Sequence, residues 1–236
     1  MTDRLVLITG ATGAAGRAAA TAFAAHGDRL ALAGRDPDRL AAAAADLGLD
    51  AERWHPVIVD LRDGAAAAAA IADLEAAAGG VDILIHLVGG WAGGTPVVET
   101  ERSAVEDMLD QHLWSTLAVA QAVIPGMAAR GWGRIVAAVP SSIVEPAPKM
   151  AAYAIAKAGQ DALLRTLARE VAGAGITVNL LSIRQIDVRR ERASEPSAKN
   201  AAWTTPEEVA ATLVSLCSDQ ASAVTGARIP LDGRRA

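Results

Sequence analysis

The chain has 236 residues, a formal net charge of −5 and 52% hydrophobic residues. These values indicate a globular protein with a sizeable core and give no reason to expect a nucleic-acid partner. No apolar run reaches the roughly 20 residues that span a bilayer, and an apolar run begins at Leu5, so we expect neither a membrane segment nor a signal peptide. The single cysteine, Cys217, excludes an internal disulfide, and we therefore expect a cytoplasmic protein.

Short apolar runs alternate with longer alanine-rich stretches of helical character. The predicted strands are residues 5–9, 29–33, 55–59, 83–88, 134–139, 176–181 and 228–231. The predicted helices cover residues 14–26, 37–47, 65–78, 101–129, 151–173 and 206–218. Strands that are apolar throughout are typical of a parallel sheet buried on both faces. The pattern predicts an α/β fold: a single domain over residues 1–236, built as a Rossmann-like doubly wound parallel sheet of about seven strands with helices on both faces.

The segment of residues 184–205 departs from this alternation, because it is polar and follows the sixth predicted strand. Such an insertion lies over the carboxyl ends of the strands, where ligands bind, and we interpret it as a substrate lid. Two readings of its arginines stay open: salt bridges with nearby acids, or binding of a carboxylate or phosphate on the substrate, with Arg184 as a candidate. The residues concerned are Arg184, Arg189, Arg190 and Arg192, with Asp187, Glu191 and Glu195 as acids.

A glycine-rich turn of residues 9–16, Thr-Gly-Ala-Thr-Gly-Ala-Ala-Gly, joins the first predicted strand to the first predicted helix. Gly10 permits the tight turn, Gly13 lets backbone N–H groups approach a pyrophosphate, and Gly16 allows close packing of helix on strand. The phosphate is expected at the helix N-terminus, where the dipole and free N–H groups favour an anion. The predicted cofactor-binding residues are Gly10, Thr12, Gly13, Ala15 and Gly16; a tight turn without a ligand is the alternative.

The end of the second predicted strand bears on the choice of cofactor. An NAD site usually places an acidic residue there, whereas a nearby arginine accommodates the 2′-phosphate of NADP. Gly34 occupies the acidic place and Arg35 follows it, which favours NADP(H) over NAD(H), although Asp36 could still reach the ribose. After the third predicted strand, Asp60 with Leu61 is interpreted as an adenine contact, or Asp60 as a helix cap.

Tyr153 and Lys157 lie four residues apart in a strongly helical stretch, so their side chains share one helix face. A phenol with a pKa near 10 is a poor acid–base group at neutral pH, and a nearby ammonium favours the phenolate. An isolated pair of this kind would be explained as a half-buried tyrosine beside a surface lysine. Its place after the fifth strand of a dinucleotide fold favours a catalytic pair instead.

These motifs, with residues 82–85, 133–136, 176–179 and 225–227, resemble the short-chain dehydrogenase/reductase family over essentially the whole chain. The resemblance implies that Tyr153 protonates or deprotonates the reacting oxygen while hydride passes between a nicotinamide and a carbonyl carbon. It implies that Lys157 binds the nicotinamide ribose and lowers the tyrosine pKa. A homo-dimer or homo-tetramer, assembled through the two long helices and the C-terminal segment, is implied as well. Residues 89–94, 114–116 and 148–150 resemble a branch of the family that includes dihydropteridine reductase.

Several places that carry functional residues in the family differ here. The helix asparagine falls on His112, which is either a substitute in the proton relay or a packing histidine. The serine place falls on Pro140; a shift of one residue could bring Ser141 to the site, where its hydroxyl would stabilise developing charge. Alternatively Ser141 and Ser142 merely start a loop, and the branch with dihydropteridine reductase is able to work without this serine.

Two further family places are also changed. Residues 86–89, His-Leu-Val-Gly, replace the family's Asn-Asn-Ala-Gly run and leave Gly89 beside the cofactor. Val188 occupies the place of a threonine that positions the nicotinamide. The histidines are too far apart in the sequence to indicate a metal site.

Three tryptophans stand out in a chain with 3% aromatic residues. Trp91 lies in a glycine loop after the fourth predicted strand, where it could stack on a flat or cyclic substrate. We expect Trp114 to pack in the core, and Trp203 to close the lid or to lie at a subunit contact.

The sequence therefore predicts an NADP(H)-dependent oxidoreductase with a carbonyl, enone or quinonoid small-molecule substrate. Tyr153, Lys157 and Ser141 are the catalytic candidates, and Trp91, His112, Ser142 and Arg184 are candidates for substrate binding. The altered family places leave two alternatives: a non-redox enzyme on this fold (a cyclase, dehydratase or isomerase), and a non-catalytic subunit that pairs with an active homologue.

Overall fold

A computed structural model describes residues 3–49 and 52–232 of the protein. Seven strands form one sheet in the order β3-β2-β1-β4-β5-β6-β7, and every neighbouring pair is parallel. They are β1 (Leu5–Thr9), β2 (Arg29–Gly34), β3 (Trp54–Ile58), β4 (Ile83–His86), β5 (Gly133–Pro140), β6 (Ile176–Ile183) and β7 (Arg228–Leu231). The chain moves outward in one direction from β1 to β3 and in the other from β4 to β7, which confirms the predicted doubly wound sheet.

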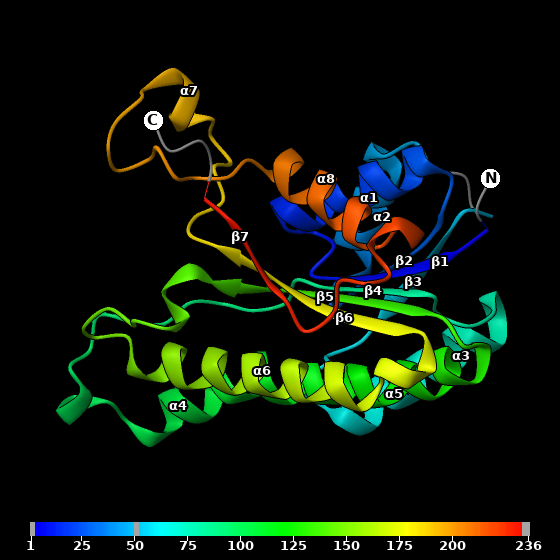
Figure 1. Ribbon diagram of the computed structural model, residues 1–236, viewed down its shortest axis with the longest axis horizontal. Helices are drawn as coiled ribbons and strands as arrows, with labels where there is room; N and C mark the ends of the chain where they lie inside the picture. Colours follow the sequence, from blue (N-terminus) through cyan, green and yellow to red (C-terminus); the bar gives the residue numbers. More distant parts are fainter. Residues whose placement is uncertain (1–2, 50–51, 233–236) are drawn as a thin grey trace.

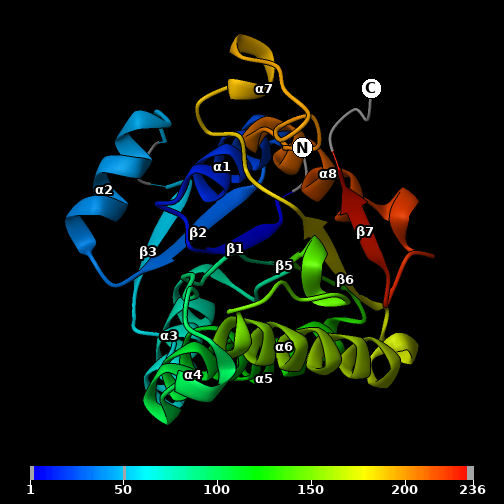
Figure 2. The ribbon, with the colours of Figure 1, turned by 90° about the vertical axis from the view of Figure 1, so that its left-hand side faces the viewer.

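Helices cover both faces of the sheet (Figure 1). One face carries α1 (Ala14–His26), α2 (Pro37–Asp46) and α8 (Pro206–Leu216). The other carries α3 (Gly64–Ala78), α4 (Arg102–Leu109), α5 (Ser115–Arg130) and α6 (Ala151–Glu170). The short helix α7 (Glu191–Ser194) stands apart beyond the carboxyl ends of the strands, on the side of α1 and α8 (Figure 2).

The two faces of the sheet have separate apolar cores, because successive strand residues point to opposite sides. Val6 and Ile8 of β1 pack in the cluster that includes α1, α2 and α8. Leu5 and Leu7 pack in the cluster that includes α3, α5 and α6. Both faces therefore require apolar residues, which explains why the strands are continuous apolar runs in the sequence.

The long helix predicted over residues 101–129 is interrupted. Between α4 and α5 lies a π turn, Asp110–Trp114, in which the backbone accommodates one extra residue per turn. Smaller differences concern element ends: β3 is Trp54–Ile58 rather than residues 55–59, β4 ends at His86 rather than at 88, and α6 ends at Glu170 rather than at 173. None of them changes the predicted topology.

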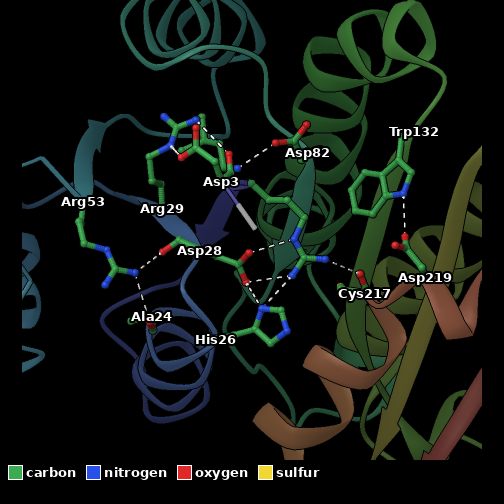
Figure 3. A network of polar contacts seen from close by, with 12 residues as sticks. Asp3, Ala24, His26, Asp28, Arg29, Arg53, Asp82, Trp132, Cys217 and Asp219 are labelled. Carbon is green, nitrogen blue, oxygen red and sulfur yellow. Dashed lines mark hydrogen bonds and ion pairs between the residues drawn. The ribbon is translucent and has the colours of Figure 1, made fainter. Parts of the chain in front are cut away.

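A network of polar contacts ties the elements together at the amino ends of the strands (Figure 3). Arg4 donates to both oxygens of the buried Asp28 carboxylate, at 2.9 and 3.1 Å, and to the Cys217 carbonyl at 3.1 Å. Arg53 donates to the Asp28 carbonyl at 3.0 Å. Burial raises the pKa of the Cys217 thiol to about 12, so this cysteine is not a reactive thiolate. This network lies at the opposite end of the sheet from the site described below, and its role is structural.

Across the described ranges, no helix has both the length and the apolar character needed to cross a bilayer.

Candidate active site

The glycine turn after β1 approaches its neighbours closely. Gly10 has a φ of +70°, which glycine adopts without strain, and Gly13 N–H donates to the Gly10 carbonyl at 3.0 Å. A Cβ at Gly16 would lie 2.2 Å from the Gly10 oxygen, so α1 begins against the turn with no room for a side chain. Among residues 3–49 and 52–232, no side chain caps the first N–H groups of α1. They are therefore available to an anion.

A cavity of about 670 Å³ opens at this turn, at the switch point between β1 and β4 where doubly wound sheets bind ligands. It brings together these predicted cofactor residues: Gly10, Thr12, Gly13, Arg35, Asp60, Leu61 and Gly89. Ala15 is buried in α1 and Gly16 lies against the turn, and neither of them lines the cavity. Tyr153 and Lys157 are also outside its lining.

Three arginines line the outer part of the cavity. Arg35 follows β2, Arg39 lies in the first turn of α2, and Arg62 follows β3. Asp36, the alternative ribose ligand, caps α2: its Oδ1 accepts from the N–H groups of Asp38 at 3.0 Å and Arg39 at 3.1 Å. Sequence reasoning named only Arg35, because the other two arginines reach this place through α2 and through the pairing of β2 with β3.

Asp60 is held by its neighbour Arg62. The carboxylate accepts from Arg62 Nε at 3.0 Å and from Nη2 at 2.5 Å. Hydrogen bonds from the Arg62 side chain hold the pKa of Asp60 below its usual range. Asp63 caps α3 by accepting from the N–H groups of Ala65 and Ala66, so the interpretation of Asp60 as the helix cap is wrong. Its contact with adenine stays a prediction.

Tyr153 lies in the first turn of α6 and is partly buried. It packs against a small apolar cluster formed by Met108, Ala152 and Ala156. The His112 ring meets its ring edge-on, with centroids 5.4 Å apart and an interplanar angle of 84°. Burial raises the pKa of Tyr153, so the phenol is protonated at neutral pH. The expectation of a lowered tyrosine pKa is wrong for this structure.

Lys157 lies one turn further along α6 and is only 6% exposed. Its Nζ donates to the Ala138 carbonyl at 3.0 Å and to Gln160 Oε1 at 2.8 Å. Within the described ranges, no hydrogen bond joins Nζ to the Tyr153 hydroxyl. Burial lowers the pKa of Lys157 to about 7, because removal from water disfavours the ammonium. This absence of direct contact explains why Lys157 does not lower the pKa of Tyr153.

His86 lies at the end of β4, opposite Thr9 of β1 in the parallel register. Its Nδ1 is 2.9 Å from Thr9 Oγ1, and its Nε2 has no hydrogen-bond partner within the described residues. Complete burial, with a smaller contribution from the Lys157 charge, lowers the pKa of His86 to about 3. The ring is therefore neutral at physiological pH.

The π turn presents His112 to the same region. Its Nε2 donates to the Gly90 carbonyl at 2.9 Å, and its Nδ1 lacks a hydrogen-bond partner within the described chain. Burial, followed by the Lys157 charge, lowers the pKa of His112 to about 4, so Nδ1 is an unprotonated acceptor at neutral pH. A Cβ at Gly89 would lie 2.0 Å from His112 Cε1, which explains the glycine after β4. The position of His112 is compatible with both of its interpretations, packing and proton relay.

Two loops meet next to the start of α6. Gly94 N–H donates to the Lys149 carbonyl at 2.8 Å, which ties the glycine loop to the loop before α6. A Cβ at Gly93 would lie 2.8 Å from Trp91 Cζ2 and 2.6 Å from Met150 Sδ, so these two side chains are neighbours. Trp91 is 65% exposed, which agrees with the predicted stacking on a flat substrate. Its contact with substrate stays a prediction.

Ser141 and Ser142 begin a 3-10 turn directly after β5. Both are exposed, and neither hydroxyl makes a hydrogen bond within the described residues. The turn packs against α6, the helix that carries Tyr153. The role of either serine stays a prediction.

The segment of residues 184–205 leaves β6 and returns through a bridge between Ile186 and Thr204. Asp187 is buried and accepts from the N–H groups of Glu191 at 2.8 Å and Arg192 at 3.0 Å. The expectation that Asp187 is a solvated salt-bridge acid is therefore wrong, because it fixes the start of α7.

Three of the four arginines in this segment form ion pairs. Arg190 pairs with Glu207 at 2.5 Å and Arg192 with Glu208 at 2.6 Å, which joins the segment to α8. Arg189 lies 4.0 Å from Glu191. These three arginines form ion pairs, as expected, but only Arg189 pairs with one of the acids expected for this segment.

Arg184 is exposed and makes no ion pair or hydrogen bond with the described part of the chain. Val188, at the place of the family's threonine, is 59% exposed. Trp114 is 48% exposed, so its predicted core packing is wrong. Trp203 is partly buried, and its carbonyl accepts from Arg192 Nη1 at 2.6 Å.

The switch-point cavity, the uncapped helix start and the adjacent Tyr153–Lys157 helix define a dinucleotide-binding enzyme of the α/β class. Its sequence matches the family described as Enoyl-(Acyl carrier protein) reductase over residues 10–233. The chain belongs to the short-chain dehydrogenase/reductase family. It is therefore an oxidoreductase of a family that uses nicotinamide cofactors.

Individual relatives extend this finding. The chain is 34% identical over 179 residues to 2-dehydro-3-deoxy-L-rhamnonate dehydrogenase (NAD(+)) of Sphingomonas sp. strain SKA58, a match covering 76% of this chain and 70% of that protein. It is 30% identical to D-threitol dehydrogenase of Mycolicibacterium smegmatis, covering 98% of this chain and 92% of the relative. The crystal structure of gox2181 superimposes with a TM-score of 0.88 at 27% identity, covering 98% of this chain and 95% of that one.

Proposed function

We propose that the chain is an NADP(H)-dependent oxidoreductase that transfers a hydride between the nicotinamide and a carbonyl, enone or quinonoid substrate. The observation that carries the cofactor preference is the group of Arg35, Arg39 and Arg62 at the outer part of the cavity. A 2′-phosphate would meet the guanidinium groups of Arg35 and Arg39 there, beside an Arg62 that already donates to Asp60, and guanidinium groups bind phosphate oxygens well. Asp36, the nearest carboxylate after β2, is engaged as a helix cap. The relative from Sphingomonas is named as an NAD(+) enzyme, and a residue-level test of cofactor choice is therefore needed.

The residues of the cavity fit such a cofactor. The turn at Gly10 and Gly13 would hold the pyrophosphate, and Asp60 with Leu61 would lie against the adenine. Gly89 would line the path toward Tyr153. When bound, the nicotinamide supplies or accepts the hydride.

Tyr153 would exchange the proton at the reacting oxygen. Burial keeps its phenol protonated, which is the state that reduction of a carbonyl requires, since the oxygen gains a proton. Lys157, whose Nζ is held by the Ala138 carbonyl and Gln160, would bind the ribose. Ser141 would donate a hydrogen bond to the same oxygen, with Ser142 as its neighbour in the 3-10 turn.

The substrate would enter between the loop of Trp91 and the segment of residues 184–205, which we propose as a lid over one catalytic domain. Trp91 is exposed beside Met150 and offers a face for a flat or cyclic compound. His112, edge-on to Tyr153, would border the substrate on the inner side. Arg184 is exposed without a partner in the described chain, and it would bind an anionic substituent if the substrate has one.

We also propose a homo-dimer or homo-tetramer in the cytoplasm. Trp114 in the π turn and Ile155 in α6 are 48% and 50% exposed, and these two elements pack against each other. Large apolar side chains of this kind are typical of subunit contacts. Light scattering during size-exclusion chromatography tests the assembly, and a monomer at micromolar concentration would contradict it.

The decisive experiment is a calorimetric titration of the protein with NADPH and, separately, with NADH. We expect NADPH to bind at least tenfold more tightly, because each charge-assisted hydrogen bond to the 2′-phosphate contributes about 1.5–3 kcal/mol. Arg39→Ala is expected to weaken NADPH about tenfold and to leave NADH nearly unchanged. Arg102→Ala is the matched control, since Arg102 is exposed on α4 and, among the described residues, pairs only with Glu106.

Equal affinity for both nucleotides would refute the cofactor assignment. Product formation without any change in nicotinamide absorbance at saturating cofactor would instead support a non-redox reaction on this fold.

A further inference from the structure

A chain of buried hydrogen bonds leads from the floor of the candidate site into the helix layer. Lys157 Nζ donates to Gln160 Oε1 at 2.8 Å, and Gln160 Nε2 donates to Thr116 Oγ1 at 2.8 Å. Thr116 Oγ1 in turn donates to the His112 carbonyl at 2.5 Å. Gln160 and Thr116 are 0% and 1% exposed. The chain of hydrogen bonds thus links α6 to α5 and ends at His112 of the π turn, whose ring meets the Tyr153 ring edge-on.

Each atom in this chain has a single possible role. The Lys157 ammonium only donates, so the amide of Gln160 must present its oxygen to Nζ and its NH₂ group to Thr116. The Thr116 hydroxyl spends its proton on the His112 carbonyl and is left as an acceptor for that NH₂ group. The orientation of the amide is therefore fixed from both ends.

Few other groups stabilise the charge on Lys157. The charge of Lys157 acts on His86 of β4 and His112 of the π turn, and Tyr153 lies one turn earlier on α6. None of the three carries negative charge. The next carboxylate on α6, Asp161, is bound to Arg228 at 2.5 Å through both of its oxygens. Within the described residues, the Ala138 carbonyl and the Gln160 amide oxygen are the only acceptors for Nζ.

A buried amide has a desolvation cost that an apolar side chain of the same size avoids. The alternative explanation is that Gln160 only packs in the core with its hydrogen bonds made. An apolar side chain would then pack there equally well. Its oxygen, however, is one of only two acceptors for an ammonium that burial destabilises.

We propose that Gln160, oriented by Thr116, is a positioning residue that keeps Lys157 charged and holds its Nζ at a fixed place against the Ala138 carbonyl. The consequence for catalysis rests on the proposed function, in which Lys157 acts as an ammonium. The protonation of Lys157 itself can be measured without any substrate or cofactor.

The test uses protein labelled with ¹³C at the lysine side chains. NMR measures the chemical shifts of the labelled side chains as a function of pH. The chain has three lysines. Lys149 and Lys199 are exposed, and the signal of the buried Lys157 is expected to have its midpoint near pH 7. We expect Gln160→Met, which keeps the length and removes the acceptor, to lower its midpoint by about one pH unit. Loss of a hydrogen bond to the ammonium disfavours the charged form, and one pH unit corresponds to about 1.4 kcal/mol.

Thr116→Val frees the amide from its orienting partner and is expected to lower the midpoint by a smaller amount. Gln160→Glu restores an oxygen acceptor and is expected to give a midpoint at or above that of the wild type. Asn179→Leu is the matched control, because Asn179 is an equally buried amide that bonds to Val224 and Ala227, far along the chain from Lys157. It should leave the midpoint of Lys157 unchanged.

The proposal would be overturned if the Lys157 midpoint stays at the wild-type value in both Gln160→Met and Thr116→Val. It would also be overturned if the midpoint falls in Gln160→Glu as far as it does in Gln160→Met. Should Gln160→Met fail to fold, Thr116→Val and Gln160→Glu decide the question. In an enzyme assay, we expect the alkaline limb of kcat/KM in Gln160→Met to move to lower pH by the same amount. A purely structural role would reduce the rate by one factor at every pH.

Because the NMR titration needs no turnover, its failure differs from failure of the proposed function. A protein without oxidoreductase activity could still show the shift in Lys157, and an active enzyme could lack it.

Discussion

Replacement of Gly16 by alanine tests the close contact on which the nucleotide turn depends. The added Cβ would lie 2.2 Å from the Gly10 oxygen and 2.8 Å from Ala11 Cα. Ordinary contact begins near 3.4 Å, so the oxygen and the new carbon must separate by about 1.2 Å. Both neighbours are backbone atoms, so no side-chain rotation can relieve the overlap.

The expected cost follows from this displacement. Overpacking of a tight contact costs about 1–3 kcal/mol, and a domain of this length loses about 2–4 °C in Tm per kcal/mol. We therefore expect the Tm of Gly16→Ala to fall by about 2–12 °C. Because the shift moves the turn that would hold the pyrophosphate, we also expect NADPH to bind at least tenfold more weakly, equivalent to about 1.4 kcal/mol.

Two control variants separate stability from binding. A Cβ at Gly13 meets only the Gly10 oxygen, at 3.4 Å, so Gly13→Ala should keep its Tm; it lines the cavity, however, and should weaken NADPH. A Cβ at Gly173 meets nothing within 4 Å, so Gly173→Ala should change neither quantity. Differential scanning fluorimetry and calorimetric titration give the two measurements. A Gly16→Ala protein with the wild-type Tm and affinity would refute the reasoning.

Three further predictions concern side chains. Tyr153→Phe should abolish turnover, measured by nicotinamide absorbance, while the Kd for NADPH stays within about twofold; retained activity would contradict the acid–base role. Lys157 has a pKa of about 7 in the folded protein against 10.5 ordinarily, so unfolding takes up a proton between these values and wild-type stability rises with pH over this window. In urea denaturation, the free energy of unfolding of the wild type relative to Lys157→Met should therefore rise from pH 7 to pH 10. A difference between the two proteins that stays constant over this range would count against a depressed pKa of Lys157. Arg228→Met leaves the buried Asp161 carboxylate without its main partner and should cost about 3–5 kcal/mol of unfolding free energy in the same assay, whereas a cost below about 1 kcal/mol would show the pair to be solvated.

Local signals made most of the fold predictable. Strands buried on both faces must be apolar throughout, and the turn at Gly10 and Gly16 needs glycine for reasons confined to a few residues. Both patterns can be seen in the sequence without knowledge of distant neighbours. The doubly wound class of sheet follows from repeated strand–helix units with right-handed crossovers, whereas the order of the strands is given by the structure.

What the sequence did not reveal depends on contacts between distant segments. Arg39 and Arg62 line the same cavity only because α2 and β3 meet beside β2. The expectation for Lys157 assumed that a pair on one helix face makes contact, whereas its Nζ is bound by Ala138 of β5 and by Gln160.

Residue type alone also misled in two places. Trp114 is a large apolar residue and was expected inside, yet the π turn leaves it half exposed. Asp187 is a carboxylate in a polar segment and was expected in solvent, yet it is buried and accepts from the first N–H groups of α7. The backbone geometry that decides both outcomes leaves no periodic mark in the sequence.

The π turn at Asp110–Trp114 also limits how the chain can change in length. α4 packs against α6, and α5 packs against α3, so the two parts of this long helix serve different neighbours. Each helical residue turns the chain by about 100°, and loss of one residue from the π turn would rotate α4 by that angle. Met108 would then leave the cluster beneath Tyr153. This stretch can vary in its side chains, but its number of residues is fixed by the angle between two helices.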